Sequence, residues 1–205
     1  MKNNIQEHTF FDEYFSDEIV IIDFGACKGD FTTQMDKQYK VKQAILVEPS
    51  LKNFSQIPQK DTYILYNRIV SKNQNQIVEF YEDENSPYNG STIFNYFNGT
   101  KHKILTITLD EIIKENNITK IDLLKVDIEG SEYDLLNNIQ DETYSKINQI
   151  TVEFHDFLDK NLIPETKKII EKLNGLGYTH EITSAKWSNI VAPHYDVIFY
   201  RKQLN

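Results

Sequence analysis

The sequence has little of what marks disulfide-rich or membrane-spanning proteins. Cys27 is its single cysteine, which excludes a disulfide within the chain and favours a reducing compartment, so we expect a cytoplasmic protein. Residues 1–15, MKNNIQEHTFFDEYF, include acidic residues and lack an apolar segment, so we expect no signal peptide. No apolar run is long enough to span a bilayer.

Positive charge is also scarce. Lysine and arginine together number 22 against 31 acidic residues, a formal net charge of -9, whereas a protein that binds the nucleic-acid backbone needs a basic face. We therefore expect no nucleic-acid partner. Glycine and proline are few, and no linker rich in them divides the chain. The length predicts one domain over residues 1–205, with residues 1–18 as an N-terminal capping segment in which residues 10–15 form a helix.

Short apolar runs alternate with helix-like stretches along the rest of the chain. We expect strands at 19–24, 44–47, 62–66, 78–81, 104–108, 121–127, 150–154, 178–183 and 195–200. We expect helices at 29–39, 51–57, 109–116, 131–139 and 164–173. Apolar strands separated by helices predict a mainly parallel sheet with helices on both faces, closed by an antiparallel edge strand. The strands at 62–66 and 78–81 are expected to be joined through a turn at 72–76.

The first expected strand ends in IIDFGACKGDF, a D-x-G-x-x-x-G pattern formed by Asp23, Gly25 and Gly29. Glycine at a strand-to-helix turn allows a positive φ and a close approach of ligand to backbone. The free N–H groups of the next helix favour an anionic group. The pattern differs from the G-x-G-x-x-G of dinucleotide sites, which disfavours a nicotinamide dehydrogenase. Cys27 lacks a base nearby in sequence, so we expect it to pack under a ligand rather than act as a nucleophile.

Glu48 ends the second expected strand, in ILVEPS. A carboxylate at that place can accept hydrogen bonds from both hydroxyls of a ribose. Alone, the glycine turn and the glutamate would be an ordinary turn and a solvent-facing side chain. Their combination in these strand contexts predicts a site for a nucleoside cofactor.

The segment IDLLKVDIEGSE places several acids at the end of an apolar strand, although carboxylates are rarely buried without a partner. If this strand lies beside the first one, Asp127 projects into the crevice beyond the strand ends. Lys125 points to the same face as Asp127 and is expected to neutralise it. Glu129 is expected to face the crevice as well. Ser131 and Glu132 are expected to begin the next helix, whose N-terminus favours acids.

The segments DFGACKG, ILVEPS, TLDEII, LLKVDIEGSEYDLL and VEFH resemble, in order, those of the FkbM-type methyltransferases. KVDIEGSE resembles the family signature K-[IV]-D-[IV]-E-G-x-E, and Cys27 departs from the asparagine that is common there. The resemblance spans residues 19–200. It implies a Rossmann-like class I fold with a seven-stranded sheet. It also implies transfer of a methyl group from S-adenosylmethionine, commonly to a hydroxyl of a sugar or polyketide.

The resemblance also implies a set of cofactor-binding residues. Asp23 and its turn would shape the methionine end, Glu48 would hold the ribose, and Asp127 would lie near the methyl group. The expected set is Asp23, Gly25, Ala26, Gly29, Glu48, Ile69, Val70 and Asp127, in which Ile69 and Val70 contact the adenine.

Methyl transfer to a hydroxyl calls for alignment and a general base. His155 follows Glu153 at the end of a strand, and we expect the two to share one face, so His155 is either the base or a buried residue bonded to Glu153. The catalytic candidates are His155, Asp127, Glu129 and Glu153. The same side chains could hold Mg²⁺ or Mn²⁺, although nothing in the sequence requires an ion.

Two segments are candidate substrate lids, with surface loops as the alternative. Residues 82–100 offer Tyr88, Tyr96 and Phe97 for stacking on a sugar, and residues 185–193 offer Trp187. The sequence thus predicts an O-methyltransferase that acts on a sugar or glycan hydroxyl. One alternative acceptor is a lipid, a polyketide or another small molecule. An alternative of another class is a non-catalytic cofactor-binding or scaffolding subunit.

Overall fold

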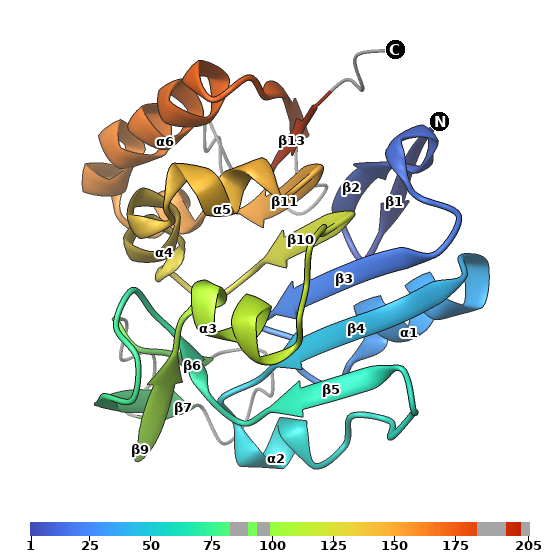
Figure 1. The fold of residues 1–205 in the computed structure, drawn as a ribbon. Helices are drawn as coiled ribbons and strands as arrows, with labels where there is room; N and C mark the ends of the chain where they lie inside the picture. The colour runs from blue at the N-terminus through green and yellow to red at the C-terminus, as the bar shows by residue number, and fades with distance from the viewer. Residues whose placement is uncertain (83–89, 94–98, 184–195, 202–205) are drawn as a thin grey trace.

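The computed structural model describes residues 1–82, 90–93, 99–183 and 196–201, and a seven-stranded sheet lies at its centre (Figure 1). The strand order is β12-β13-β11-β10-β3-β4-β5. Their bounds are β3 Ile19–Phe24, β4 Val41–Val47, β5 Tyr63–Tyr66, β10 Leu123–Val126, β11 Gln149–Glu153, β12 Thr179–Thr183 and β13 Asp196–Tyr200. The lid candidates Tyr88, Tyr96, Phe97 and Trp187 lie outside the described residues.

The strand order reverses at β3, which lies between β4 and β10 and runs parallel to both. The expectation that the strand of IDLLKVDIEGSE lies beside the first apolar strand is confirmed. Lys125 is in register with Asp23, and Val126 is in register with Phe24. Ligands bind beyond the carboxyl ends of such strands, at the reversal of order. The fold therefore predicts a ligand site just past β10, where Asp127 follows the strand.

The antiparallel strand is β13, which pairs with β11 on one side and β12 on the other. The expected antiparallel pair at the edge of the sheet is confirmed, with β12 as the edge strand and β13 second. Burial explains the order. Every residue of β13 is buried, whereas β12 is partly exposed along its length. The more apolar strand takes the inner place.

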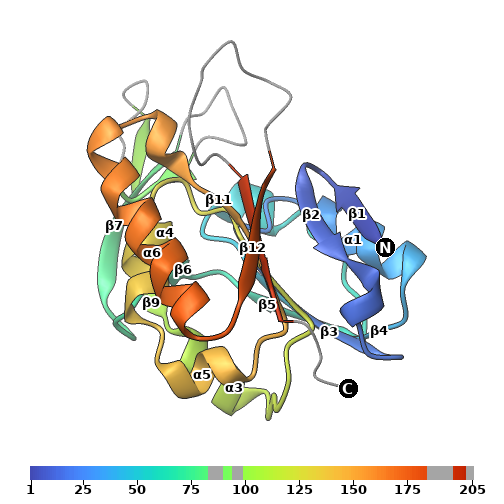
Figure 2. The same cartoon turned by 90° about the horizontal axis from the view of Figure 1, so that it is seen from above.

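Helices cover both faces of the sheet, as expected (Figure 2). Along β3, Ile19 and Ile21 pack on the α1 side and Ile22 and Phe24 on the other side, as the alternation of a strand requires. One face carries α1 Asp30–Gln38. The other face carries α3 Leu109–Glu115, α4 Glu132–Asn138, α5 Asp141–Ser145 and α6 Ile163–Gly175. The short helix α2 Leu51–Phe54 follows β4. Of the helices in the described ranges, none combines the length and apolar character needed to cross a bilayer.

The N-terminal segment is a β-hairpin, so the expected capping helix at residues 10–15 is wrong. The hairpin consists of β1 Lys2–Ile5 and β2 His8–Phe11 and is followed by a single 3-10 turn, Asp12–Tyr14. Both turn residues, Gln6 and Glu7, have positive φ, which matches the twist of paired strands. Phe11 donates from its N–H to Gln149 Oε1 at 2.8 Å and accepts from Gln149 Nε2 at 3.0 Å. These bonds hold β2 against β11.

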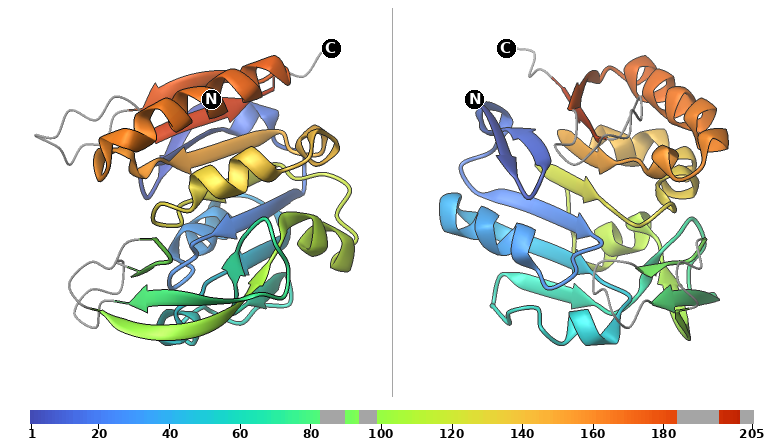
Figure 3. Two further views of the ribbon diagram at one scale, coloured as in Figure 1. Left: turned by 90° about the vertical axis from the view of Figure 1, so that its left-hand side faces the viewer. Right: turned by 180° about the vertical axis from the view of Figure 1, so that it is seen from behind.

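A second, four-stranded sheet lies beside the large sheet (Figure 3). Its order is β6-β9-β7-β8, with β6 Ile69–Val70, β7 Ile77–Glu82, β8 Gly90–Ser91 and β9 Thr100–Ile107. The expected join of the strands at 62–66 and 78–81 through a turn at 72–76 is wrong, since β6 intervenes, β5 belongs to the large sheet and β7 pairs with β9. Phe80 is buried where Ile77 and Glu79 are exposed, the pattern of a sheet with one solvated face.

Gly25→Ala tests the close contact between the ends of β3 and β10. Gly25 has a φ of +75°, and an added Cβ would lie 1.7 Å from the carbonyl oxygen of Asp127. We expect the free energy of unfolding, measured by urea denaturation, to fall by about 3 kcal/mol or more. The matched control is Gly175→Ala, where nothing lies within 4 Å, with an expected change below about 1 kcal/mol. Equal effects of the two changes would contradict the contact.

Candidate active site

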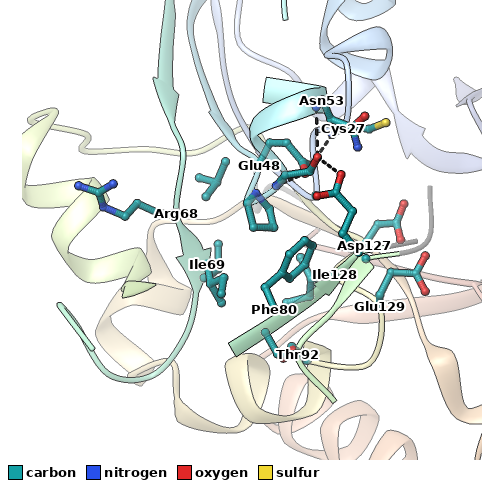
Figure 4. Close-up of a pocket in the computed structure, with 18 of the residues that line it drawn as sticks. Cys27, Glu48, Asn53, Arg68, Ile69, Phe80, Thr92, Asp127, Ile128 and Glu129 are labelled. Atoms are coloured by element: carbon teal, nitrogen blue, oxygen red, sulfur yellow. Dashed lines mark hydrogen bonds between the residues drawn. The ribbon is translucent and has the colours of Figure 1, made fainter. Parts of the chain in front are cut away.

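A cavity of about 590 Å³ lies beyond the carboxyl ends of the central strands, between the two sheets (Figure 4). This size suits a small organic ligand. In the close-up, Glu48 lies beside Cys27, and Asp127, Ile128 and Glu129 follow one another along a neighbouring wall. Of the residues predicted for the site, the lining includes Gly25, Glu48, Ile69, Val70, Asp127, Glu129 and Glu153.

The glycine turn places backbone directly against the cavity. The N–H groups of Gly25 and Ala26 both donate to the Val47 carbonyl at 3.1 Å, which holds the turn against β4. Gly29, with a φ of 77°, precedes the first residue of α1. Ala26 and Gly29 shape the turn from behind and do not line the cavity. Burial and then the nearby Glu48 raise the pKa of the Cys27 thiol to about 11, so it stays protonated and is a poor nucleophile.

Glu48 is a buried carboxylate held by backbone. Its Oε2 accepts from the Cys27 N–H and its Oε1 from the Ser50 N–H, both at 2.8 Å. Burial raises the pKa of Glu48 to about 7, against the opposing effect of these two hydrogen bonds. A carboxylate can accept about four hydrogen bonds, so acceptor capacity remains for hydroxyl groups of a ligand.

Another part of the cavity lining is apolar and comes from the second sheet. Ile69 and Val70, both of β6, are 6% and 5% exposed, and Phe80 of β7 is 4% exposed. All three line the cavity. Gly90 lies so close to the Phe80 ring that an added Cβ would be 2.4 Å from Phe80 Cζ. The second sheet therefore supplies a flat apolar surface suited to an aromatic ring.

Lys125 is the buried cation beneath the cavity. Its Nζ lies 3.2 Å from Asp23 Oδ1 and 3.5 Å from Asp127 Oδ2, and it donates to the Gly25 carbonyl at 2.9 Å. Burial alone would lower the pKa of Lys125, but the two carboxylates outweigh burial and raise it. The expectation that Lys125 neutralises the acids is confirmed.

Asp23 is fully buried and lies below the cavity rather than in its lining. Its Oδ2 accepts from the Thr32 hydroxyl at 2.8 Å, and its Oδ1 faces Lys125. The side chain expected to contact the cofactor directly thus reaches the cavity only through Lys125 and the turn. Asp127 does line the cavity. Burial would raise the pKa of Asp127, but Lys125 and His8 hold it well below its usual range.

His155 lies just past β11, in the 3-10 turn His155–Phe157, and is 2% exposed. Its Nδ1 lies 3.1 Å from Glu132 Oε1 and its Nε2 lies 3.2 Å from Glu129 Oε2. The expectation that His155 and Glu153 share one strand face is wrong, because β11 ends at Glu153 and His155 lies in the turn that follows. Burial opposes a charge on His155, but Glu132 and Glu129 outweigh it and raise the pKa of His155 well above its usual value.

Glu132 organises the turn after β10. It is fully buried, and its Oε1 accepts from the N–H groups of Ile128 and Gly130, each at 3.0 Å. The expected helix start is confirmed, with Ser131 at the N-cap and Glu132 as the first residue of α4, although the Ser131 side chain makes no cap hydrogen bond. Instead, Glu132 fixes a turn in which Glu129 has a φ of 52°, and it orients the His155 ring. In the sequence, the only sign of this role was the position of Glu132 as the last acid of KVDIEGSE.

Two site residues come from the N-terminal hairpin and were missed in the sequence. Glu7 lines the cavity, and His8 Nε2 lies 3.6 Å from Asp127 Oδ2. Burial, followed by Lys125, outweighs the attraction of Asp127 and lowers the pKa of His8, which favours neutral imidazole. The hairpin turn is Gln-Glu rather than the Asn-Gly that signals such a turn, so nothing local predicted that these side chains reach the site.

Acidic groups crowd this end of the cavity. Asp196 of β13 is in register with Glu153 of β11. Burial, followed by repulsion from Glu7 and Asp127, raises the pKa of Asp196 to about 7. Among the described residues, two sets of three have ligand atoms within 4.8 Å of one another: His8, Asp127 and Glu153, and Asp127, Glu129 and His155. Both sets could hold a metal ion, and they share Asp127.

Comparison with known proteins gives one family and a shared fold. The model of the methyltransferase FkbM domain matches residues 23–179. The chain is 32% identical over 81 residues to 31-O-demethyl-FK506 methyltransferase FkbM of Streptomyces tacrolimicus. The matched region covers 40% of this chain and 29% of that protein. The chain is also 38% identical over 58 residues to AMB antimetabolite synthetase AmbE of Pseudomonas aeruginosa, which covers 28% of this chain and 3% of that protein.

Among solved structures, methyltransferase FkbM from Methylobacillus flagellatus KT superposes with a TM-score of 0.60 at 17% sequence identity. The superposition covers 91% of this chain and 44% of that chain. It shows that the two chains share a fold. Each of these matches spans less than half the length of the relative.

His155→Ala tests whether Glu132 depends on the imidazole. Removing the ring would leave the fully buried Glu132 carboxylate with only its two backbone donors. Loss of one partner of a buried ion pair typically costs about 3–5 kcal/mol, and we expect a decrease of that size in urea denaturation. The control is His102→Ala on β9, an exposed histidine, with a change below about 0.5 kcal/mol. A change at His155 as small as that of the control would contradict the buried pair.

Proposed function

The chain belongs to the FkbM methyltransferase family, and on that premise we propose that it transfers the methyl group of S-adenosylmethionine to a hydroxyl group of an acceptor. The observation that carries the proposal is one cavity that combines three kinds of group. A glycine turn exposes backbone, Glu48 offers carboxylate oxygens beside an apolar wall, and Asp127 and Glu129 line the same space. The first two suit a nucleoside cofactor, and the third suits a polar acceptor.

The residues present fit S-adenosylmethionine. The Asp127 backbone occupies the place of a Gly25 side chain, so glycine is needed for the ends of β3 and β10 to pack together. Gly25 also lines the cavity, where the methionine part can contact the turn. Glu48 retains acceptor capacity for the ribose hydroxyls. Ile69 and Val70 offer apolar contact for the adenine. Asp23 contributes by holding Lys125 in place rather than by touching the cofactor.

The bound cofactor supplies an electrophilic methyl group on a sulfonium. In the transfer, the acceptor oxygen forms a bond to the methyl carbon while the carbon–sulfur bond breaks, and its electron pair stays on sulfur. Alignment of the two bonds can contribute up to about 7–11 kcal/mol. The hydroxyl proton passes to His155 Nε2 in molecules in which that nitrogen has lost its own proton, a fraction that grows with pH because the pKa of His155 is raised. Glu132 then stabilises the imidazolium at Nδ1. The Nε2 atom now faces Glu129, the cavity-lining residue that an acceptor hydroxyl would displace.

The acceptor proposed first is a sugar or glycan hydroxyl. A lipid, a polyketide or another small molecule is the second acceptor class, and the name of the Streptomyces relative, which describes an O-demethylated compound as its substrate, favours oxygen as the acceptor atom in either case. A single cysteine supports a reducing, cytoplasmic setting as part of the proposal. Residues 1–205 are proposed to act as one cofactor-binding domain.

Glu48 is expected to govern cofactor affinity and its pH dependence. Calorimetry at pH 8 should give saturable binding of S-adenosylmethionine and none of NAD. Glu48→Ala should weaken binding about tenfold or more, the loss of at least one hydrogen bond to a charged group. Affinity of the unchanged protein should fall below pH 7, since the carboxylate with a pKa of about 7 then gains a proton and loses acceptor capacity.

Two controls accompany the titration. Glu48→Gln cannot titrate, so its affinity should be flat between pH 8 and about 5.5. Glu18→Ala removes an exposed carboxylate paired with Lys40, and it should leave affinity unchanged. If S-adenosylmethionine does not bind to the unchanged protein, the proposal is wrong. If Glu48→Ala binds as tightly as Glu18→Ala, the assignment of the ribose site is wrong.

His155→Gln separates catalysis from binding, because glutamine can still donate to Glu132 but cannot take a proton. We expect cofactor affinity within about twofold and a transfer rate lower by about 10²- to 10⁴-fold, measured with labelled cofactor and a panel of sugar, lipid and polyketide hydroxyls. His180→Gln on β12, where the ring contacts Asn174, serves as the control. Full turnover by His155→Gln would remove His155 as the base. Cofactor binding with no transfer to any acceptor would favour a non-catalytic subunit.

A further inference from the structure

Three possible metal ligands converge from segments far apart in the sequence. His8 lies at the start of β2, Asp127 directly follows β10, and Glu153 is the last residue of β11. One ligand atom from each lies within 4.8 Å of the other two. Donor atoms that share one divalent cation at 2.0–2.6 Å lie no more than about 5 Å apart. The spacing therefore fits a single ion without rearrangement of the strands.

His8 is the observation that distinguishes this set from a cluster of surface acids. It is 4% exposed, and its ring packs edge-on against Phe31 with centroids 5.6 Å apart. Its Nε2 is directed at Asp127 Oδ2 at 3.6 Å, longer than a hydrogen bond. A buried polar group normally makes its hydrogen bonds. A separation of 3.6 Å is one that two ligands of a single cation can have, so a cation bound by both atoms would satisfy the imidazole.

Lys125 does not act as that cation. Its Nζ contacts Asp23 and the Gly25 carbonyl, below the cavity, and reaches Asp127 at 3.5 Å. Lys125 thus approaches the same Asp127 oxygen, Oδ2, as His8 does, but Asp23 and the Gly25 carbonyl hold its Nζ in place. Glu7, Glu129 and Glu153 all line the same cavity. An excess of carboxylates in one cleft attracts cations.

We propose that His8, Asp127 and Glu153 form a site for a divalent cation of the Mg²⁺ or Mn²⁺ class. Two carboxylates and one imidazole give an oxygen-rich set with a single nitrogen, which suits these ions better than the softer ones bound by thiolates. Of the two overlapping sets, this one is preferred because both ring nitrogens of His155 already contact carboxylates, Glu132 at 3.1 Å and Glu129 at 3.2 Å.

The role of the ion rests on the proposed function, whereas its binding does not. Three protein ligands leave coordination positions open toward the cavity. An acceptor hydroxyl that occupies one of them would be oriented beside the methyl group and would give up its proton more readily. An acceptor with two neighbouring hydroxyls, as in a sugar, could occupy two positions.

The test is Mn²⁺ binding by the full chain after treatment with EDTA, followed by electron paramagnetic resonance of free Mn²⁺ in the absence of cofactor. We expect saturable binding of one ion that excess Mg²⁺ displaces. His8→Gln and Glu153→Gln should each weaken binding about tenfold or more, as loss of one ligand requires. His155→Gln and the remote His180→Gln should change it by no more than about twofold. Circular dichroism verifies that each variant is folded.

Two results would overturn the site. One is the lack of saturable Mn²⁺ binding by the unchanged chain. The other is binding that His155→Gln abolishes and His8→Gln leaves intact, which would assign the ion to the second set. Titration of the same samples with S-adenosylmethionine keeps the two proposals apart. A chain that binds the cofactor but no Mn²⁺ refutes the ion alone, and one that binds Mn²⁺ but no cofactor refutes the methyl-transfer proposal alone.

Discussion

The site depends on one buried ammonium group. Lys125 forms ion pairs with Asp23 of β3 and with Asp127, which follows β10. These two strands are neighbours at the point where the strand order reverses, so the ion pairs connect the two halves of the sheet. Buried carboxylates without this cation would be costly. Because Lys125 also donates to the Gly25 carbonyl, it fixes the glycine turn. The same side chain thus holds both the glycine turn at Gly25 and the acidic residue Asp127 at the end of β10.

A second buried arrangement lies at the turn after β10. The turn after Asp127 is fixed by Glu132, whose carboxylate binds two backbone N–H groups and the His155 ring. Glu132 therefore relates the end of β10 to the end of β11 without lining the cavity. The N-terminal hairpin closes the same side and brings in His8. The cavity wall is built from segments that are far apart in the sequence. Substitution of one buried residue should therefore lower the free energy of unfolding far more than a surface substitution does.

Much of this was predictable from sequence, for physical reasons. The apolar period of β3, β4, β10 and β11 gave the parallel sheet, and the residues at the strand ends gave Glu48, Asp127 and Glu129 a common edge. Three features were not predictable from local pattern. β13 lies inside β12 because of relative burial, His155 leaves the strand face because β11 ends early, and His8 reaches Asp127 through a hairpin with an unusual turn. Each is set by tertiary packing rather than by propensity.

The central claim is that one cavity holds the cofactor with its ribose on Glu48 and its sulfur near Asp127. The most direct measurement is a crystal structure of the chain with S-adenosylhomocysteine bound. The account predicts ribose hydroxyls within hydrogen-bond distance of the Glu48 carboxylate, adenine against Ile69 and Val70, and the sulfur facing the space beside Asp127 and Glu129. A ligand bound elsewhere, or one whose ribose makes no contact with Glu48, would contradict it.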